Sequence, residues 1–257
     1  MSFEGKIILI TGSSSGIGQA CAEFFAKENA LLSLVGRNIE RFNSVLENIK
    51  ALNVENEPLI IVADVSVDFE RIISETIAKY HRLDVLINNA AFLHPGTLET
   101  TKIEDFDAMF ATNVRGLFQL TQSAVCHLIK SKGNIVNVSS VVGLRAFPHL
   151  LGYAMLKSAV DTFTRCIALE LADKGVRVNS INPGVIDTPF HTTAGIAAEA
   201  YPAVRAMMGK NHPIGRVGEA SEVVNAIAFV ANENNSFMTG VCLPVDGGLA
   251  IKCPFTV

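Results

Sequence analysis

Short apolar runs rich in β-branched residues alternate with helix-like stretches along the chain. This alternation restricts the possible fold classes more than any other feature of the sequence. We expect buried strands at 7–11, 31–35, 59–63, 85–88, 135–139, 176–181 and 242–245. Helical patterns lie between them, among others at 19–28, 41–52, 69–79, 103–130 and 153–172. This βαβα order predicts an α/β fold, in which helices cover both faces of a doubly wound parallel sheet of about seven strands.

The first predicted strand ends in a glycine-rich turn. Gly12, Gly16 and Gly18 follow it, and the amphipathic stretch 19–28 comes next. Glycines let the backbone approach a pyrophosphate, while the helix start offers unpaired N–H groups and the positive end of the helix dipole. The same glycines could simply end a strand and begin a helix. The order of strand, turn and helix favours a dinucleotide-binding turn.

Tyr153 and Lys157 lie four residues apart, with Ser140 thirteen residues upstream. Within a helix both side chains project from one face into the same cleft. Free tyrosine titrates near pH ~10, and a neighbouring ammonium favours the phenolate, which suits the pair to proton exchange with a substrate oxygen held by Ser140. An amphipathic tyrosine beside a snorkelling lysine needs no function. Together with the glycine turn, however, the pair predicts a hydride-transfer site.

Ligands of parallel sheets bind outside the carboxyl ends of the strands. One candidate residue follows each of five predicted strands at that end: Gly12, Asp64, Asn89, Ser140 and Pro183. Five separated segments that meet at one edge indicate a binding site rather than five unrelated turns.

These motifs together resemble the classical short-chain dehydrogenase/reductase (SDR) family, and the resemblance covers nearly the whole chain. The motifs stand in the family's order: a glycine motif at 11–18, an acidic residue at Asp64, Asn-Asn-Ala at 88–90, and Asn-Pro-Gly with a later threonine at 182–188. The resemblance implies a single NAD(P)-binding domain of Rossmann type over 1–257. Ala91 departs from the family, which usually has glycine there, and we expect a small backbone adjustment with binding retained.

The resemblance also implies roles for a catalytic tetrad. Tyr153 exchanges a proton with the substrate oxygen, Ser140 orients that oxygen, and Lys157 lowers the pKa of the tyrosine and holds the nicotinamide ribose. Asn113, expected near the start of a helix, would hold a water that links Lys157 to solvent, or would instead satisfy backbone donors as a cap. Ser139 is expected to bond strand or turn backbone. The implied cofactor contacts, besides Tyr153 and Lys157, are Gly12, Ser14, Ser15, Gly16, Ile17, Gly18, Arg37, Asn38, Asp64, Val65, Asn89, Ala90, Pro183, Gly184, Ile186 and Thr188.

Cofactor choice is expected at the end of the second strand, about 25 residues beyond the glycine turn. An acid at this place accepts both ribose hydroxyls of NAD and repels a 2′-phosphate. This chain has Gly36, Arg37 and Asn38 there, which predicts a preference for NADP(H) with Arg37 contacting the phosphate. The glycine turn carries serines where many NADP-preferring relatives have a second basic residue. Use of NAD(H), with Arg37 stacked on adenine, therefore stays open.

The segment 190–213 is similar to the family's variable substrate lobe. Its apolar side chains, Met207 and Met208 among them, suit a lipophilic ligand under a movable lid. An amphipathic helix packed on the core would have the same composition, and the two interpretations stay open. For His191 and His212 we favour surface or packing roles over contact with substrate.

Composition excludes several other classes of protein. A formal net charge of −4 gives no basic footprint for nucleic acid or an anionic membrane. The apolar run at 7–10 is too short for the core of a signal peptide, and no stretch is apolar enough to span a bilayer, so a cytoplasmic protein is expected. Five scattered cysteines and six histidines without metal-ligand spacing predict reduced thiols and no metal site.

The sequence therefore predicts an oxidoreductase that transfers a hydride between NADP(H) and a carbonyl/secondary alcohol pair. Steroid-, retinoid-, terpenoid- and xenobiotic-like carbonyl compounds all fit the lobe. The family resemblance implies a homotetramer. The alternatives are an NAD-preferring dehydrogenase of the same family and a non-catalytic nucleotide-binding protein that senses redox state, although a complete tetrad disfavours the latter.

Overall fold

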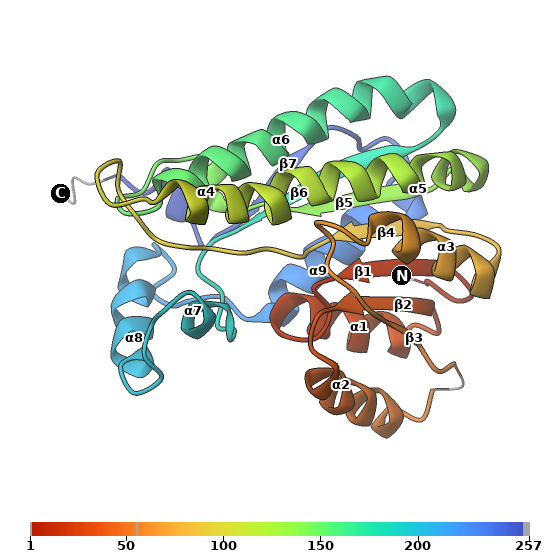
Figure 1. Cartoon of the computed structure of the whole chain (residues 1–257), viewed down its shortest axis with the longest axis horizontal. Helices are drawn as coiled ribbons and strands as arrows, with labels where there is room; N and C mark the ends of the chain where they lie inside the picture. Colours follow the sequence, from red (N-terminus) through yellow and green to blue (C-terminus); the bar gives the residue numbers. More distant parts are fainter. Residues whose placement is uncertain (1, 55, 254–257) are drawn as a thin grey trace.

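One seven-stranded parallel sheet forms the centre of the protein (Figure 1). The structure, a computed structural model, describes residues 2–54 and 56–253. The strands lie in the order β3-β2-β1-β4-β5-β6-β7. Their bounds are β1 Ile7–Thr11, β2 Leu31–Gly36, β3 Leu59–Val62, β4 Val85–Asn88, β5 Asn134–Val138, β6 Arg177–Pro183 and β7 Cys242–Val245. All seven predicted strands are confirmed, with bounds that differ by two residues or fewer.

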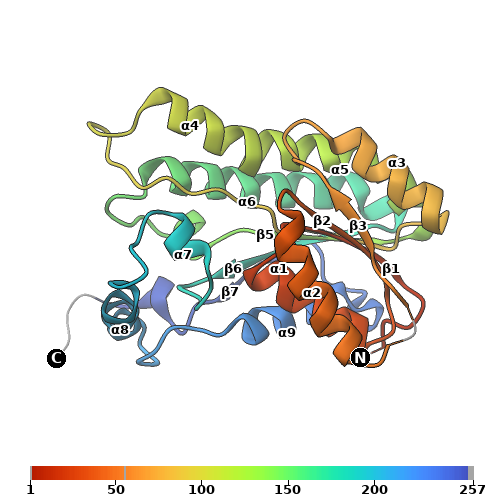
Figure 2. The same ribbon diagram turned by 60° about the horizontal axis from the view of Figure 1, so that its bottom comes forward.

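Helices cover both faces of the sheet, so the predicted doubly wound architecture is confirmed (Figures 1 and 2). One face carries α1 (Gly16–Lys27), α2 (Ile39–Ala51) and α9 (Ala220–Ala231). The opposite face carries α3 (Phe69–Tyr80), α5 (Leu117–Ser131) and α6 (Leu151–Leu171). Three shorter helices complete the set: α4 (Ile103–Phe110), α7 (Phe190–Thr193) and α8 (Tyr201–Asn211).

The central strand β1 shows why the predicted strands are apolar at every position instead of alternating between apolar and polar residues. All its residues are buried, with Ile8 and Ile10 in the core beneath α1 and α9, and Ile7 and Leu9 in the core beneath α3 and α5. Successive side chains of a strand point to opposite faces, and both faces of this sheet are covered. Each strand therefore needs apolar residues at every position.

The stretch 103–130, predicted as one helix, is interrupted by a π-helical turn at Ala111–Gly116 between α4 and α5. Asn113 lies within this turn, so the expectation that it stands near the start of a helix is wrong. At Gly116 an added Cβ would lie 2.8 Å from the carbonyl oxygen of Val65, so the absence of a side chain lets this turn pack tightly against the end of the β3 segment. Single π turns of this kind often occur at functional sites.

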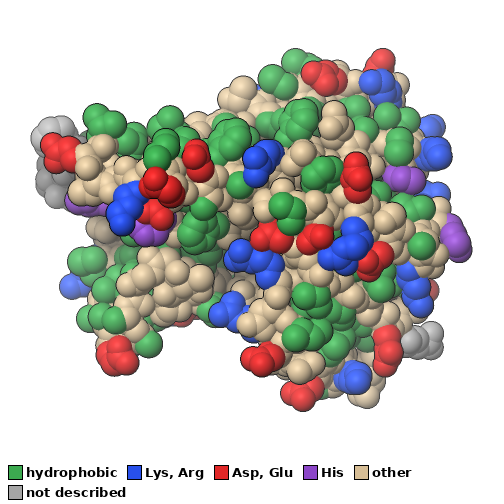
Figure 3. All heavy atoms as spheres, viewed as in Figure 1, with side chains coloured by type: hydrophobic (Ala, Val, Ile, Leu, Met, Phe, Trp, Pro, Cys, Tyr) green, Lys and Arg blue, Asp and Glu red, His purple; other side chains and the backbone are tan. Residues whose placement is uncertain are grey.

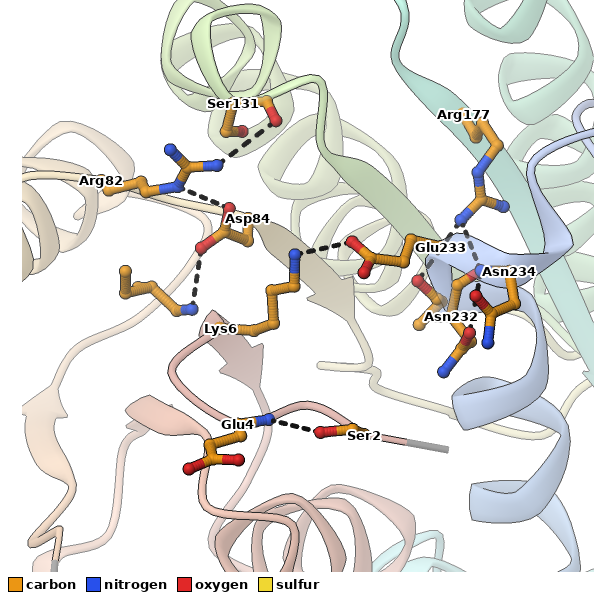
Figure 4. Close-up of polar contacts among 12 residues, drawn as sticks. Ser2, Glu4, Lys6, Arg82, Asp84, Ser131, Arg177, Asn232, Glu233 and Asn234 are labelled. Atoms are coloured by element: carbon orange, nitrogen blue, oxygen red, sulfur yellow. Dashed lines mark hydrogen bonds and ion pairs between the residues drawn. The ribbon is translucent and has the colours of Figure 1, made fainter.

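At the amino ends of the strands, ion pairs and hydrogen bonds join separate elements (Figure 4). The buried carboxylate of Asp84 accepts from the backbone N–H of Ile7 at 3.0 Å and from Nε of Arg82 at 2.7 Å. Nearby, Lys6 and Glu233 form an ion pair at 2.7 Å, with the glutamate largely exposed. These contacts join the start of β1 to the start of β4 and to the segment after α9.

Arg177, the first residue of β6, closes the end of α9 at the same edge (Figure 4). Its guanidinium donates to the carbonyls of Val230, Ala231, Asn232 and Met238, at distances from 2.8 to 3.3 Å. The last carbonyls of a helix have no partner within the helix, and a cation near them is favourable. Arg177 therefore satisfies the end of α9 while anchoring β6 to it.

None of the helices within residues 2–54 and 56–253 has the length and apolar character that crossing a bilayer would require.

Candidate active site

The strand order places the candidate site where the direction of winding reverses. β1 pairs with β2 on one side and with β4 on the other, so the chain connections after these strands leave on opposite faces. In such sheets ligands bind at the carboxyl ends of the strands beside this switch point. The predicted site residues that follow β1, β4 and β5 lie at this edge.

Tyr153 and Lys157 occupy one buried face of α6, as the four-residue spacing predicted. Their exposed fractions are 7% and 2%, and Nζ of Lys157 lies 5.4 Å from the centre of the tyrosine ring. The ammonium donates to the carbonyl of Val138 at 2.8 Å, which ties α6 to the end of β5. The phenol and the ammonium are therefore adjacent, in a setting from which bulk water is largely excluded.

Burial moves the pKa values of this pair in opposite directions, because it penalises both charged forms. It raises the pKa of Tyr153, and it lowers the pKa of Lys157 to about 8, an effect that the charge of Asp161 opposes. The expected lowering of the tyrosine pKa by Lys157 stays a prediction, because desolvation alone accounts for the direction of the Tyr153 pKa.

The two serines at the end of β5 do different things. Ser140 is half-buried and caps the following turn, where its Oγ accepts a long 3.4 Å hydrogen bond from the N–H of Val142. Its hydroxyl proton therefore stays available to another acceptor. Ser139 is buried and donates to the backbone carbonyl of Lys157 at 3.2 Å. The expectation that Ser139 bonds strand or turn backbone is wrong, because it fixes α6 instead.

Asn113 presents its amide from the π-helical turn, which packs against α6. Its Nδ2 donates to the carbonyls of Phe92 and Met109 at 2.7 and 2.8 Å, whereas its buried Oδ1 has no partner among the described groups. Because this oxygen accepts from no backbone N–H of the described residues, the alternative role as a helix cap is wrong. The orientation leaves an acceptor oxygen inside the site.

The glycine turn forms a close-packed cradle between β1 and α1. An added Cβ at Gly18 would lie 2.3 Å from the carbonyl oxygen of Gly12, and one at Gly12 would lie 2.8 Å from Cα of Ala90. Gly12 also has φ +63°, in the region that favours glycine. These contacts explain two of the three glycines without a ligand, and they bring the backbone of the first turn of α1 to the sheet edge, where its N–H groups suit a pyrophosphate.

Thr11 and Asn89 connect the glycine turn to the end of β4, a role that sequence analysis did not assign. The Thr11 hydroxyl accepts from the backbone N–H groups of Asn89 and Ala90, both at 3.0 Å. The Asn89 amide donates back to the carbonyls of Thr11 and Gly12. Ala91 has an ordinary negative φ, so its methyl group introduces no backbone strain at this junction.

Arg37 lies at the carboxyl end of β2 beside Asp64, with a guanidinium-to-carboxylate distance of 3.5 Å. The arginine side chain is 67% exposed and can turn toward a ligand. Although partial burial opposes it, hydrogen bonds from Ser66 and the charge of Arg37 lower the pKa of Asp64. Asn38 caps α2 by accepting from the N–H of Arg41, which gives it a structural role beside the predicted cofactor contact.

The segment after β6 faces the glycine turn. An added Cβ at Gly16 would lie 3.2 Å from Cβ of Thr188, so these two predicted cofactor contacts are neighbours. Gly184 is close to His212, a buried histidine whose Nε2 accepts from the N–H of Val185 at 3.2 Å. Its Nδ1 must carry the proton, because its partner is a backbone carbonyl. His212 therefore has the expected packing role and joins this segment to the lobe.

The lobe 190–213 projects beside the carboxyl edge, as Figures 1 and 2 show for α7 and α8, and the surface is hollowed between it and the body of the protein (Figure 3). Within the described chain α8 buries only Gly209 completely, and Tyr201, Val204, Arg205 and Met208 form a half-buried face at helical spacing, so a movable lid and an amphipathic helix packed on the core both stay open. The lobe is held through Asp187, which accepts from the Tyr201 hydroxyl at 2.8 Å and pairs with Arg205. The His191 ring stacks on Tyr201 and bonds a backbone carbonyl, a packing role.

The surroundings of Tyr153 are apolar. Its ring centre lies 6.2 Å from that of Phe190 at the start of the lobe, and it shares a hydrophobic cluster with Val142 and Leu249. Arg145 fixes the carboxyl-terminal part of this wall by donating from Nη1 to the carbonyls of Leu249, Ala250 and Lys252. Sequence analysis missed Arg145, because nothing in its spacing marks a contact with residues more than a hundred positions away.

No group of three or more metal-ligating side chains that could hold a metal ion occurs in the part of the chain that the structure describes.

Comparison with known proteins identifies relatives over nearly the full length. The family described as Enoyl-(Acyl carrier protein) reductase matches residues 12–250. A 3-oxoacyl-[acyl-carrier-protein] reductase of Thermotoga maritima is 36% identical over 252 residues, which are 98% of this chain and 100% of that protein. A glucose 1-dehydrogenase of Gluconobacter oxydans is 38% identical over 257 residues, covering 98% of this chain and 95% of that protein.

Solved structures agree with the fold and differ in the cofactor they hold. A short-chain dehydrogenase/reductase of Caenorhabditis elegans, solved with cofactor, has a TM-score of 0.93 at 36% identity and covers 98% of this chain and 97% of that one. A 3-ketoacyl-(acyl-carrier-protein) reductase of Brucella melitensis complexed with NADH has a TM-score of 0.87 at 32% identity, covering 97% and 100%. The protein ElxO with NADP bound has a TM-score of 0.87 at 33% identity, covering 96% and 100%.

Proposed function

Because the chain belongs to the short-chain dehydrogenase/reductase family of oxidoreductases, we propose that it transfers a hydride between NADP(H) and a carbonyl/secondary alcohol pair. The observation that carries this proposal is the buried pair of Tyr153 and Lys157 on one face of α6, with the free hydroxyl of Ser140 at the end of the adjacent strand. A nucleotide-binding protein without catalysis has no need of a buried phenol beside a buried ammonium, and desolvating both groups is costly.

The cradle fits a dinucleotide. Gly12 and Gly18 exclude side chains where a pyrophosphate would approach α1, and the contact of Gly16 with Thr188 closes the far side. Lys157 would hold the nicotinamide ribose. When bound, the reduced nicotinamide supplies a hydride, and its oxidised ring is a cation that favours the tyrosine phenolate.

In the reducing direction Tyr153 is the general acid. Ser140 donates to the carbonyl oxygen of the substrate and orients it, and the Tyr153 hydroxyl gives that oxygen its proton as the carbon receives the hydride. The C=O double bond becomes CH–OH, and the phenolate regains a proton through Lys157. Oxidation of an alcohol reverses each step, with the phenolate as base.

The preference for NADP(H) is assigned to Arg37. Its exposed guanidinium at the end of β2 can pair with a 2′-phosphate, and Asp64 holds it near that place. The same ion pair favours a second candidate, an NAD(H)-preferring enzyme, because an arginine already paired with a carboxylate has less to offer a phosphate. The solved relatives with NADH and with NADP fit either choice.

Steady-state kcat/KM with both cofactors decides between them. Arg37→Ala should weaken NADPH by ten- to a hundred-fold, since hydrogen bonds between charged groups contribute roughly 1.5 to 3 kcal/mol, and should leave NADH nearly unchanged. If the wild-type enzyme already prefers NADH, Arg37 does not bind a 2′-phosphate and only pairs with Asp64. Gly36→Asp is a poor companion variant, because an added Cβ there would lie 3.1 Å from both the Phe42 ring and the Ser14 hydroxyl.

A lipophilic substrate is proposed from the apolar wall around Tyr153. Phe190 stands between the tyrosine and the lobe, so its truncation should affect large ligands most. Phe190→Ala should raise KM for bulky apolar ketones by about five- to a hundred-fold, at about 1 to 3 kcal/mol for a lost buried contact, and change KM for small ketones little. Equal effects on both would assign Phe190 to packing and the substrate to another class.

A homotetramer, a cytoplasmic location and the mobility of the 190–213 lobe stay predictions from the family resemblance. Apolar side chains exposed on α4, α5 and α6 are consistent with assembly, Ile103, Phe118 and Met155 among them. Light scattering coupled to size exclusion measures the assembly directly.

A further inference from the structure

We propose that Asp161 is a positioning residue of the hydride-transfer site, which keeps Lys157 charged and holds Asn182 against the backbone of Ser140. The inference rests on the proposed function and deepens it by adding a carboxylate to the predicted tetrad. Asp161 follows Lys157 by four residues on α6, so the two side chains project from the same face.

Asp161 is a deeply buried carboxylate whose oxygens accept several hydrogen bonds. It is 2% exposed. Its Oδ1 accepts from the Ser180 hydroxyl at 3.1 Å and from Nδ2 of Asn182 at 3.0 Å, and its Oδ2 accepts from the same Nδ2 at 2.9 Å. Both donors lie on β6, so the carboxylate joins α6 to that strand.

The network continues from Asp161 to the candidate catalytic serine. Nδ2 of Asn182 also donates to the backbone carbonyl of Ser140 at 3.0 Å, so the carboxylate fixes the amide that fixes the serine. An added Cβ at Gly143 would lie 2.5 Å from Oδ2 of Asp161, which shows how closely the turn after Ser140 packs on this group. The carboxylate thus sets the position of the β5 end relative to α6 and β6.

The charge of Asp161 bears on Lys157. Tyr153 and Asp161 stand one helical turn before and after Lys157 on the same face of α6, and the ammonium itself lies 5.4 Å from the centre of the Tyr153 ring and donates to the uncharged carbonyl of Val138 on β5. The charge of Asp161 opposes the effect of burial on the lysine, and the two together leave the Lys157 pKa at about 8. Loss of the carboxylate should therefore lower the Lys157 pKa further.

The test is the titration of Lys157 itself, followed by NMR of its labelled side chain in the full-length protein with and without cofactor, alongside pH profiles of kcat/KM. Asp161→Asn removes the charge but places its amide against the amide of Asn182, which could prevent folding. Asp161→Ser is therefore the second variant, because it also removes the charge and its small hydroxyl can still accept from Asn182. Both variants should lower the Lys157 pKa by about one to two units, the size expected of one unit charge near a buried cation. kcat/KM at pH 8 should fall about ten-fold and recover toward pH 6.

Asp84→Asn is the matched control, since it neutralises a carboxylate of similar burial at the opposite edge of the sheet. It should lower stability without moving the Lys157 titration. An unshifted titration in both Asp161 variants, or an equal shift in the control, would overturn the proposal. Absence of hydride transfer in the wild type would instead refute the proposed function, while the titration would still decide the link between Asp161 and Lys157.

Discussion

The two edges of the sheet bury polar groups in opposite ways. At the amino edge Arg177 donates to four carbonyls, and the Asp84 carboxylate is shared by a guanidinium and a backbone N–H. At the carboxyl edge Tyr153 and Lys157 are buried more deeply than the half-buried Arg177. Burial lowers the pKa of Arg177 too, but it raises that of Tyr153 and brings that of Lys157 down to about 8. The comparison indicates that one edge fixes the fold while the other accepts unfavourable burial that suits proton transfer.

The two edges also differ in how they hold a buried aspartate, Asp84 at the amino edge and Asp161 at the carboxyl edge. Asp84 meets the charged Arg82 at 2.7 Å, so its charge is neutralised locally. Asp161 is held by the neutral groups of Ser180 and Asn182. Its negative charge is therefore left to act on its neighbour Lys157, which explains why a carboxylate can be structural at one edge and part of the site at the other.

The largest expected effect is at the carboxyl edge. Tyr153→Phe removes the proposed proton donor and keeps the ring that packs beside Phe190. Loss of general acid–base catalysis should lower kcat by 10² to 10⁴ and leave cofactor affinity and stability nearly unchanged. Tyr80→Phe, which loses a hydroxyl bonded to the Leu32 carbonyl far from the site, is the control. Near-normal turnover in the Tyr153 variant would refute its role.

Arg177→Leu should give the largest effect at the amino edge, and on stability rather than turnover. Three carbonyls at the end of α9 and the carbonyl of Met238 lose the arginine, while Asn134 and Asn179 still donate to those of Val230 and Met238, so the change should cost about 2 to 4 kcal/mol of unfolding free energy. Urea unfolding measures the loss, and kcat per folded molecule should stay at the wild-type value. Lys174→Leu, a nearby exposed cation, controls for the general loss of charge. A fall in kcat without a loss of stability would contradict the assignment of the amino edge to stability alone.

Lys157→Met should raise stability while abolishing activity, because it removes a buried ammonium. The folded-state pKa of about 8 lies below the ordinary lysine value of 10.5, so the native state binds fewer protons than the unfolded state between these values. Stability of the wild type should therefore rise with pH from about 8 to 10.5, and the penalty is present in full below pH 8. The variant should gain about 1 to 3 kcal/mol at pH 6.5 and little at pH 10.5 in urea unfolding. An equal gain at both values would assign the effect to packing instead of charge.

Sequence reasoning predicted what depends on local pattern and on residue spacing. The strand β1 is recognisable because a parallel strand covered on both faces must be apolar throughout, and Tyr153 and Lys157 share a face because a helix repeats every 3.6 residues. Both rules hold for a segment considered alone. The fold and the outline of the candidate site follow from them once the order of the segments is known.

The remaining parts depend on contacts between distant segments. The π-helical turn at Asn113 lies where Gly116 packs against the Val65 carbonyl. The sequence around neither residue indicates this contact. The link from Asp161 to Asn182 joins a helix to a strand twenty-one residues away. The direction of the Tyr153 pKa also required the structure, because spacing reveals a neighbouring charge but not the depth at which both groups are buried.

The smallest expected effect comes from the exposed part of the amino edge and limits how far the comparison extends. Lys6 and Glu233 lie 2.7 Å apart, and the glutamate side chain is 73% exposed. Water and salt screen such a pair, and ordering two long side chains opposes it, so Lys6→Met should cost less than about 1 kcal/mol. Measured in 1 M salt, where the Debye length falls to about 3 Å, the difference from wild type should nearly vanish, whereas the loss in Arg177→Leu should persist. A large loss in Lys6→Met that disappears in 1 M salt would mean that charge alone, not burial with several partners, stabilises this edge.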